Sequence, residues 1–403
     1  MSAPSRRDAL LMPSARGQRV LVWAGLLLLA LSLRPLVTSV GPVLSDVRTN
    51  LHMSGAVASL TTTLPVLCFA AFAGLTPVAV HSVGLHRTSL LAMTALTGGL
   101  LLRVAVASQV VFVLGSVLAL AGAGAGNVLA PALVKRHFPD RVSLITGIYS
   151  MLLQATTALG AAVSVPLADS LGGWRAGLGS WALLSALAML PWLGLLGRDP
   201  HVRTASGRIA ARDLVGSRTA WMLALFFGAQ SAQAYAVFGW LPDILHSAGV
   251  GKQIGGIAVS IVAAAGVPVS IALPFALRRL PGLRPLMIFL AACYVAAYAG
   301  LLLAPSGAPY LWALLLGLGG GAFPLCLTLL GLRARTTAST NALSGFVQSV
   351  GYVVAAPGPF LVGALHDATG SWTPPLAVLL VSIAGMLALG FGVARPTYVD
   401  DEL

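Results

Sequence analysis

The sequence is poor in charge, and above all in acidic residues. Charged residues make up only 9% of the 403 residues, whereas soluble proteins carry about 25%. Eleven residues are acidic, and none of them lies at the middle of an apolar segment; the same holds for the seven histidines. A carrier of cations would be expected to hold a carboxylate within the membrane. The sequence therefore argues against a carrier of cations or polyamines.

Groups that metal binding or catalysis would require are also missing. The three cysteines, Cys68, Cys293 and Cys326, all lie in apolar segments and form no Cys-x-x-Cys pair. They predict neither a disulfide framework nor a metal site. There is no His/Asp/Glu cluster, no nucleophile–base pair and no phosphate-binding loop. We therefore expect a protein that is not an enzyme and that uses no metal and no cofactor.

Long apolar runs dominate the rest of the chain. Hydrophobic residues make up 57% of the sequence, and the runs are about 20 residues long, which matches about 30 Å of hydrocarbon. We predict an all-α polytopic membrane protein with twelve transmembrane helices. The predicted spans are 20–44, 55–80, 88–107, 109–133, 142–168, 174–196, 219–242, 253–277, 285–304, 309–332, 341–365 and 373–394.

Basic residues collect on one side of this map. The N-terminal segment, the C-terminal segment and every second loop hold 19 of the 24 basic residues, and the opposite loops hold only Arg48, Arg175 and Lys252. By the positive-inside rule, both termini are predicted to be cytoplasmic and the protein to lie in the cytoplasmic membrane. This topology accounts for the net charge of +13, so no nucleic-acid partner is needed.

The chain repeats itself at an offset of 198 residues. The segment "TGIYSMLLQATTALGAAVSVPLADSLGGW" aligns with "SGFVQSVGYVVAAPGPFLVGALHDATGSW". Three glycines, one aspartate and one tryptophan coincide in order: Gly147 with Gly345, Gly160 with Gly358, Asp169 with Asp367, Gly172 with Gly370 and Trp174 with Trp372. Two pseudo-symmetric six-helix bundles are predicted, with a substrate site between them near the bilayer midplane. The predicted units are a tail 1–19, a bundle 20–196, a central loop 197–218, a bundle 219–394 and a tail 395–403.

This organisation resembles the major facilitator superfamily. The loop "GLTPVAVHSVGLHRT" is similar to its cytoplasmic Gly…Gly…Arg motif, although the usual aspartate is missing. The segments "LRPLVTSVGPVL", "GNVLAPALVKRHFPDR", "GWLP", "GAFPLCLTLLGLRAR" and "LSGFVQSVGYVVAAPGP" resemble one branch, the cyanate/nitroimidazole transporter family. The resemblance implies a secondary active transporter that works by alternating access. We expect it to bind a small-molecule substrate and to function as a monomer in the lipid bilayer.

Arg34 is the most unusual residue, because it lies near the middle of the first span, directly before Pro35. A charge at that depth costs about 2.5–3.5 kcal/mol on insertion scales. One interpretation is that Arg34 faces a central cavity and binds an anionic or electron-rich substrate, since its planar fork suits such partners. The other is that it bonds carbonyl groups freed by Pro35. Arg103, near the outer end of the third span, is expected to reach the interface by snorkelling.

Polar residues at helical spacing mark further candidates. A stripe in the fifth span aligns, at the same offset, with a stripe in the eleventh span, which is what a path between two related bundles would show. Hydrogen bonding between helices is the alternative explanation. The predicted substrate-binding residues are Arg34, Thr38, Asn127, Gln230, Tyr235 and Gln348, and the predicted path residues are Ser150, Gln154 and Tyr352.

Three functions are compatible with these features. The first is a carrier for a small anionic or polar solute, similar to cyanate carriers, with Arg34 as the counter-charge. The second is an exporter of small aromatic or nitro-heterocyclic compounds, with Tyr235 and Trp240 stacking on the ligand. The third is a membrane receptor or scaffold that transports nothing.

Overall fold

The computed structural model describes residues 15–53, 55–196 and 211–403, and these are helical with short connections. Most of the predicted N-terminal tail and most of the predicted central loop lie outside the described residues. In the first half, the helices are α2 (Ala15–Ser32), α3 (Pro35–Thr38), α4 (Val40–Asn50), α5 (Gly55–Val83), α6 (Leu85–Ala105), α7 (Gln109–His137), α8 (Val142–Ser170) and α9 (Trp174–Leu193).

The second half begins with the short α10 (Ala211–Leu214) and ends in a 3-10 turn at Val399–Asp401. Between them lie α11 (Arg218–Ser247), α12 (Lys252–Arg279), α13 (Arg284–Leu303), α14 (Pro309–Gly319), α15 (Ala322–Leu332), α16 (Thr337–Ala355), α17 (Pro357–Thr369) and α18 (Thr373–Val393). Eleven segments of the described chain are long and apolar enough to cross a membrane. The 30-residue helix α11, which carries Gln230 and Gln233, is the twelfth long segment of the described chain.

Three of the predicted spans are built from more than one helical piece. The first is broken around Leu33–Arg34, because Pro35 has no N–H to continue the ladder, and it is broken again at Ser39. The tenth is broken at Gly320–Gly321 and the eleventh before Pro357. These breaks matter for function because two of them lie beside the cavity described below.

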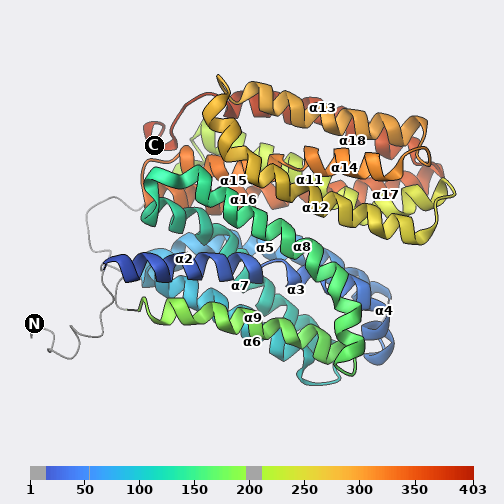
Figure 1. Cartoon of the computed structure of the whole chain (residues 1–403), viewed down its shortest axis with the longest axis horizontal. Coiled ribbons are helices and arrows are strands. Elements are labelled where there is room, and N and C mark those ends of the chain that lie inside the picture. Colours follow the sequence, from blue (N-terminus) through green and yellow to red (C-terminus); the bar gives the residue numbers. More distant parts are fainter. Residues whose placement is uncertain (1–14, 54, 197–210) are drawn as a thin grey trace, which may run out of the picture.

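The two halves form two bundles that lie side by side (Figure 1), and glycines that the repeat matched set their approach. A Cβ on Gly147 of α8 would lie 2.8 Å from Pro274 of α12, and one on Gly345 of α16 would lie 2.5 Å from Pro77 of α5. Gly160 and Gly358 likewise lie against α3 and α11. Gly147 and Gly345 therefore pack against the opposite bundle, whereas Gly160 and Gly358 each pack against a helix of their own bundle.

The contacts at Gly147 and Gly345 close one end of the interface between the bundles, here called the terminal seam. The end that they close is where α16 begins and where the C-terminal tail packs. Lys135 of α7 also crosses between the halves there, donating to the Gly331 carbonyl of α15 at 3.3 Å. The bundles are therefore in direct contact at the end that holds the C-terminus.

The C-terminal tail binds the starts of two helices at that end. Glu402 accepts hydrogen bonds from the Ser217 hydroxyl at 2.6 Å and from the Thr219 N–H at 2.9 Å, at the start of α11. Asp400 accepts from the Arg335 N–H at 2.7 Å, just before α16. Helix N-termini leave N–H groups unsatisfied and carry partial positive charge, so Glu402 caps the start of α11. Asp400 binds the residue before the Thr336 cap of α16 and accepts from the Ser339 hydroxyl in its first turn.

Candidate functional site

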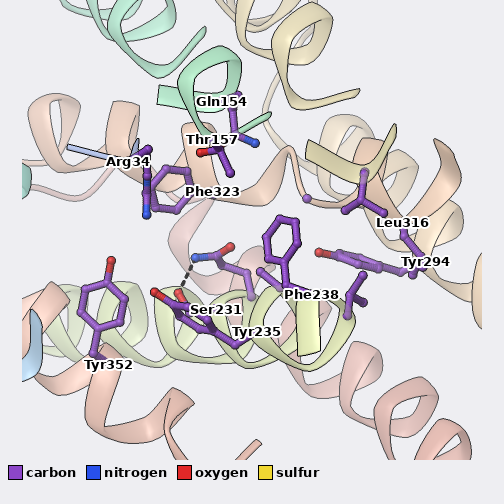
Figure 2. A pocket seen from close by; sticks show the side chains of 16 residues that line it. Arg34, Gln154, Thr157, Ser231, Tyr235, Phe238, Tyr294, Leu316, Phe323 and Tyr352 are labelled. Carbon is purple, nitrogen blue, oxygen red and sulfur yellow. Dashed lines mark hydrogen bonds between the residues drawn. The ribbon is translucent and has the colours of Figure 1, made fainter. Parts of the chain in front are cut away.

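A cavity lies between the two bundles, at the level of the break in the first span (Figure 2). About 710 Å³ within it is not filled by protein atoms, part of that open to solvent. Five of the predicted site residues line it: Arg34, Gln154, Gln230, Tyr235 and Tyr352. They come from α8, α11, α16 and the segment before α3, so both halves contribute.

Arg34 reaches the cavity because the helix is broken at that residue. Its carbonyl accepts from the N–H groups of Val37 and Thr38, at 3.0 and 3.1 Å, which starts the short helix α3. Its guanidinium lies over the ring of Phe323, 5.1 Å from the centroid. The Arg34 Nε is buried without a hydrogen-bond partner in the described part of the chain. The charge therefore lies on an aromatic face. The alternative role, in which Arg34 bonds carbonyl groups freed by Pro35, does not apply to its Nε, which has no such partner.

Two tyrosines from the second half face the guanidinium. Tyr235 of α11 and Tyr352 of α16 have ring centroids 6.4 Å apart. Figure 2 shows their hydroxyls on the same side of the cavity as Arg34, and both hydroxyls interact with the Arg34 charge. Arg34, Tyr235 and Tyr352 thus form a group of hydrogen-bond donors around one point, as the binding of an oxygen anion would require.

Amides and hydroxyls complete the polar part of the lining. Gln230 donates from Nε2 to the Ser231 hydroxyl at 2.7 Å, the dashed line in Figure 2, while its Oε1 is buried without a partner among the described residues. Gln154 and Thr157 enter from α8. None of the lining residues is acidic, so Arg34 is the one formal charge in the lining.

The other predicted site residues do not line the cavity in this conformation. Thr38 donates to the Arg34 carbonyl at 3.3 Å and lies against Gly160. Gln348 donates to the Asn127 carbonyl at 3.1 Å and so joins α16 to α7. Ser150 is fully buried on α8, one turn toward the terminal seam from Gln154.

Three aromatic residues of the lining were not singled out from the sequence: Phe238, Tyr294 and Phe323. An aromatic side chain in an apolar span does not stand out from its neighbours, so the sequence holds no contrast that would mark them. The break at Gly320–Gly321, two residues before Phe323, is the one available signal.

The expectation for Arg103 was wrong. Arg103 is 1% exposed and does not snorkel to an interface; its Nη1 donates to the Leu36 carbonyl at 3.1 Å. Position along a span suggested an easy route to water, but α7 packs directly on α6 at this point. A Cβ on Gly115 of α7 would lie 2.4 Å from the backbone nitrogen of Arg103, and this contact between the two helices helps to enclose Arg103.

The described residues contain no group of three or more His, Cys, Asp or Glu side chains that could hold a metal ion. What the cavity offers instead is one cation, several neutral donors and five aromatic rings, a combination suited to a planar solute with an electron-rich end.

Two helical bundles, many membrane-spanning segments and a cavity between the halves define a polytopic solute carrier. The chain belongs to the Major Facilitator Superfamily, whose family model matches residues 26–356, and it is a transporter of small solutes.

The relatives agree with the branch predicted from sequence motifs. The chain is 35% identical over 377 residues to the 2-nitroimidazole transporter of Escherichia coli (strain K12), covering 93% of this chain and 95% of the relative. It is 28% identical over 365 residues to the cyanate transport protein CynX of the same organism, covering 90% and 94%. The proton:xylose symporter XylE has the same fold, with a TM-score of 0.74, 11% identity, and coverage of 96% of this chain and 98% of that structure.

Proposed function

We propose that this chain is a secondary active transporter of a small planar solute with an anionic or electron-rich group, and that Arg34 is the counter-charge. The observation that carries this is the Arg34 guanidinium itself, which lies in the cavity over Phe323 and beside two tyrosine hydroxyls. An unpaired charge within the membrane is costly, so a ligand that neutralises it gains binding free energy.

Two substrate classes fit this proposal. A small anion such as cyanate, named for one relative, would bind Arg34 and the tyrosine hydroxyls. An aromatic or nitro-heterocyclic solute, the class named for the other relative, would also contact the rings of Phe238, Tyr294 and Phe323. The aromatic lining favours a ring-bearing solute. A ring can make stacked and edge-to-face contacts with the five aromatic side chains, whereas a triatomic anion has no ring for such contacts.

The residues buried in the terminal seam would complete the path. Ser150, Asn127 and Gln348 lie between the cavity and the closed end, and Ser150 Oγ and Asn127 Nδ2 have no hydrogen-bond partner among the described residues. We propose that they contact solute when the six-helix units 20–196 and 219–394 separate at that end. The closed end would be cytoplasmic, as the distribution of basic residues predicts.

The proposal is tested by binding and flux with purified protein in liposomes, using cyanate, benzoate and 2-nitroimidazole. Arg34→Gln should weaken binding of the preferred solute about ten- to a hundredfold, because a charged hydrogen bond contributes about 1.5–3 kcal/mol. Arg34→Lys should retain part of the affinity, since it keeps the charge but not the planar fork. Arg48→Gln, an exposed arginine in the last turn of α4, outside the first span, is the control and should bind as wild type. Normal affinity in Arg34→Gln would refute the role of Arg34.

A further inference from the structure

A second buried arginine holds the segment that carries Arg34. Arg103 lies on α6, is 1% exposed, and donates from Nη1 to the carbonyl of Leu36, two residues after Arg34. Its Nε and Nη2 have no hydrogen-bond partner within the described residues. A buried cation satisfied by one carbonyl is unfavourable for stability, so stability alone does not account for an arginine here.

The segment on the other end of this hydrogen bond has little structure of its own. Helix α3 spans four residues between two breaks. A single turn of helix is not stable by itself, because few intrahelical bonds compensate for fixing its backbone. Its position must therefore come from neighbouring helices.

Two neighbours hold α3. On the α8 side, Gly160 allows close approach: a Cβ there would lie 2.4 Å from Thr38 Oγ1 and 3.0 Å from Pro35 Cα. On the α6 side, the Arg103 guanidinium holds the Leu36 carbonyl. Arg34 immediately precedes Pro35, whose ring fixes one backbone angle. The direction of the Arg34 side chain therefore depends on where α3 is held.

We infer that Arg103 is a positioning residue for Arg34: by binding the Leu36 carbonyl it keeps α3 in the place from which Arg34 faces the cavity. The inference rests on the proposed function, since it gives Arg103 its effect on substrate through Arg34. It also explains why a planar donor with a long side chain occupies a buried position on α6.

The test is a double-mutant cycle on the purified full-length protein, with the dissociation constant of benzoate as the measured quantity. Arg103→Met, which keeps an unbranched side chain but cannot donate, should weaken benzoate binding about tenfold, the loss of one well-aligned charged hydrogen bond. Arg103→Lys, whose ammonium still donates, should recover part of that loss. In an Arg34→Gln background, Arg103→Met should have no further effect, because the group that it positions is gone.

The outcomes separate the two hypotheses. If wild type binds none of cyanate, benzoate and 2-nitroimidazole, or if Arg34→Gln binds benzoate normally, the proposed function fails. If Arg34→Gln is weakened but Arg103→Met binds benzoate as wild type, the positioning role is refuted. It is also refuted if the two losses multiply in the double variant, since Arg103 then acts independently of Arg34.

A second variant covers the case in which Arg103→Met does not fold. Gly115→Ala places a methyl group 2.4 Å from the backbone nitrogen of Arg103. It should shift α6 relative to α7 without removing any charged side chain. It should weaken benzoate binding in wild type but not in Arg34→Gln. Gly98→Ala, on α6 with nothing within 4 Å of the added carbon, is the matched control and should leave binding unchanged. Unchanged binding in Gly115→Ala would overturn the inference.

Discussion

Replacing Gly345 by alanine should open the terminal seam. The added Cβ would lie 2.5 Å from Cγ of Pro77 and 3.0 Å from the Ala73 carbonyl oxygen, whereas ordinary contact begins at 3.4 Å. The Pro77 ring is rigid and the other atom belongs to the backbone, so neither side relaxes cheaply. Overpacking of this kind costs about 1–3 kcal/mol. Because the cost falls on the closed seam and not on the open one, the population with an open seam should rise about five- to 150-fold.

A buried thiol measures this shift. Ser150 is fully buried on α8 in the closed seam, so a cysteine placed there should react slowly with a small water-soluble thiol reagent. The three native cysteines, Cys68, Cys293 and Cys326, are themselves buried and are changed to alanine in the reporter protein. Adding Gly345→Ala should raise the labelling rate in proportion to the open population.

The control has the same change at a glycine without neighbours. Gly256 has nothing within 4 Å of its added carbon, so Gly256→Ala should label as slowly as the parent. Equal rates for Gly345→Ala and Gly256→Ala, in protein with an unchanged melting temperature, would show that Gly345 does not seal the seam. A lowered melting temperature with fast labelling of all sites would instead indicate loss of the fold.

Three further outcomes are expected. Glu402→Gln should lower the free energy of unfolding in detergent by about 0.5–1 kcal/mol, the low end for the loss of a helix cap, because the site is exposed. Burial raises the pKa of Glu402, but hydrogen bonds from Ser217 and Thr219 have the larger effect and leave that pKa below its ordinary value of 4.5. The stabilisation should therefore be present above pH 4.5 and vanish as pH falls through the lowered pKa, where variant and wild type should converge; a constant difference down to low pH would contradict this. Phe323→Leu should weaken benzoate binding about two- to fivefold through loss of the ring under Arg34, worth about 0.5–1 kcal/mol, whereas Phe360→Leu, on an exposed face, should not. A single cysteine at Ser206, in the predicted central loop, should be labelled only after permeabilisation of intact cells, and labelling from outside would reverse the predicted orientation.

The fold and part of the site could be predicted because polar residues stand out within the apolar segments of the sequence. A charged or amide side chain within an apolar span is expensive, so Arg34, Gln154 and Gln230 stand out, and all three line the cavity. The number of helical segments and the pairing of the two halves also follow, because apolar runs and matched glycines are local features. Tyr235 and Tyr352 were found because they share faces with such residues.

The remainder of the site depends on three-dimensional packing that no local pattern encodes. Phe323 lies in a run of apolar residues, and its place under Arg34 results from a break in the tenth span that brings it toward the first. Arg103 was misjudged because depth along a helix does not reveal which neighbour covers it, and here Gly115 brings α7 against it. Thr38 lies one helical turn after Arg34 but packs against Gly160 of α8, a contact between helices that spacing along one span does not reveal.

The charge balance of the cavity determines which step of a transport cycle the membrane voltage acts on. Arg34 is the one formal charge among the lining residues. A monovalent anion would cancel it, so the loaded centre would be electrically neutral while the empty centre carries a positive charge. Moving one charge through a potential of 100 mV changes its energy by about 2.3 kcal/mol. For an anionic substrate, voltage would therefore have little effect on the conformational change of the substrate-bound protein. It would act on the conformational change of the empty protein, so that an inside-negative potential favours empty sites that face the inside.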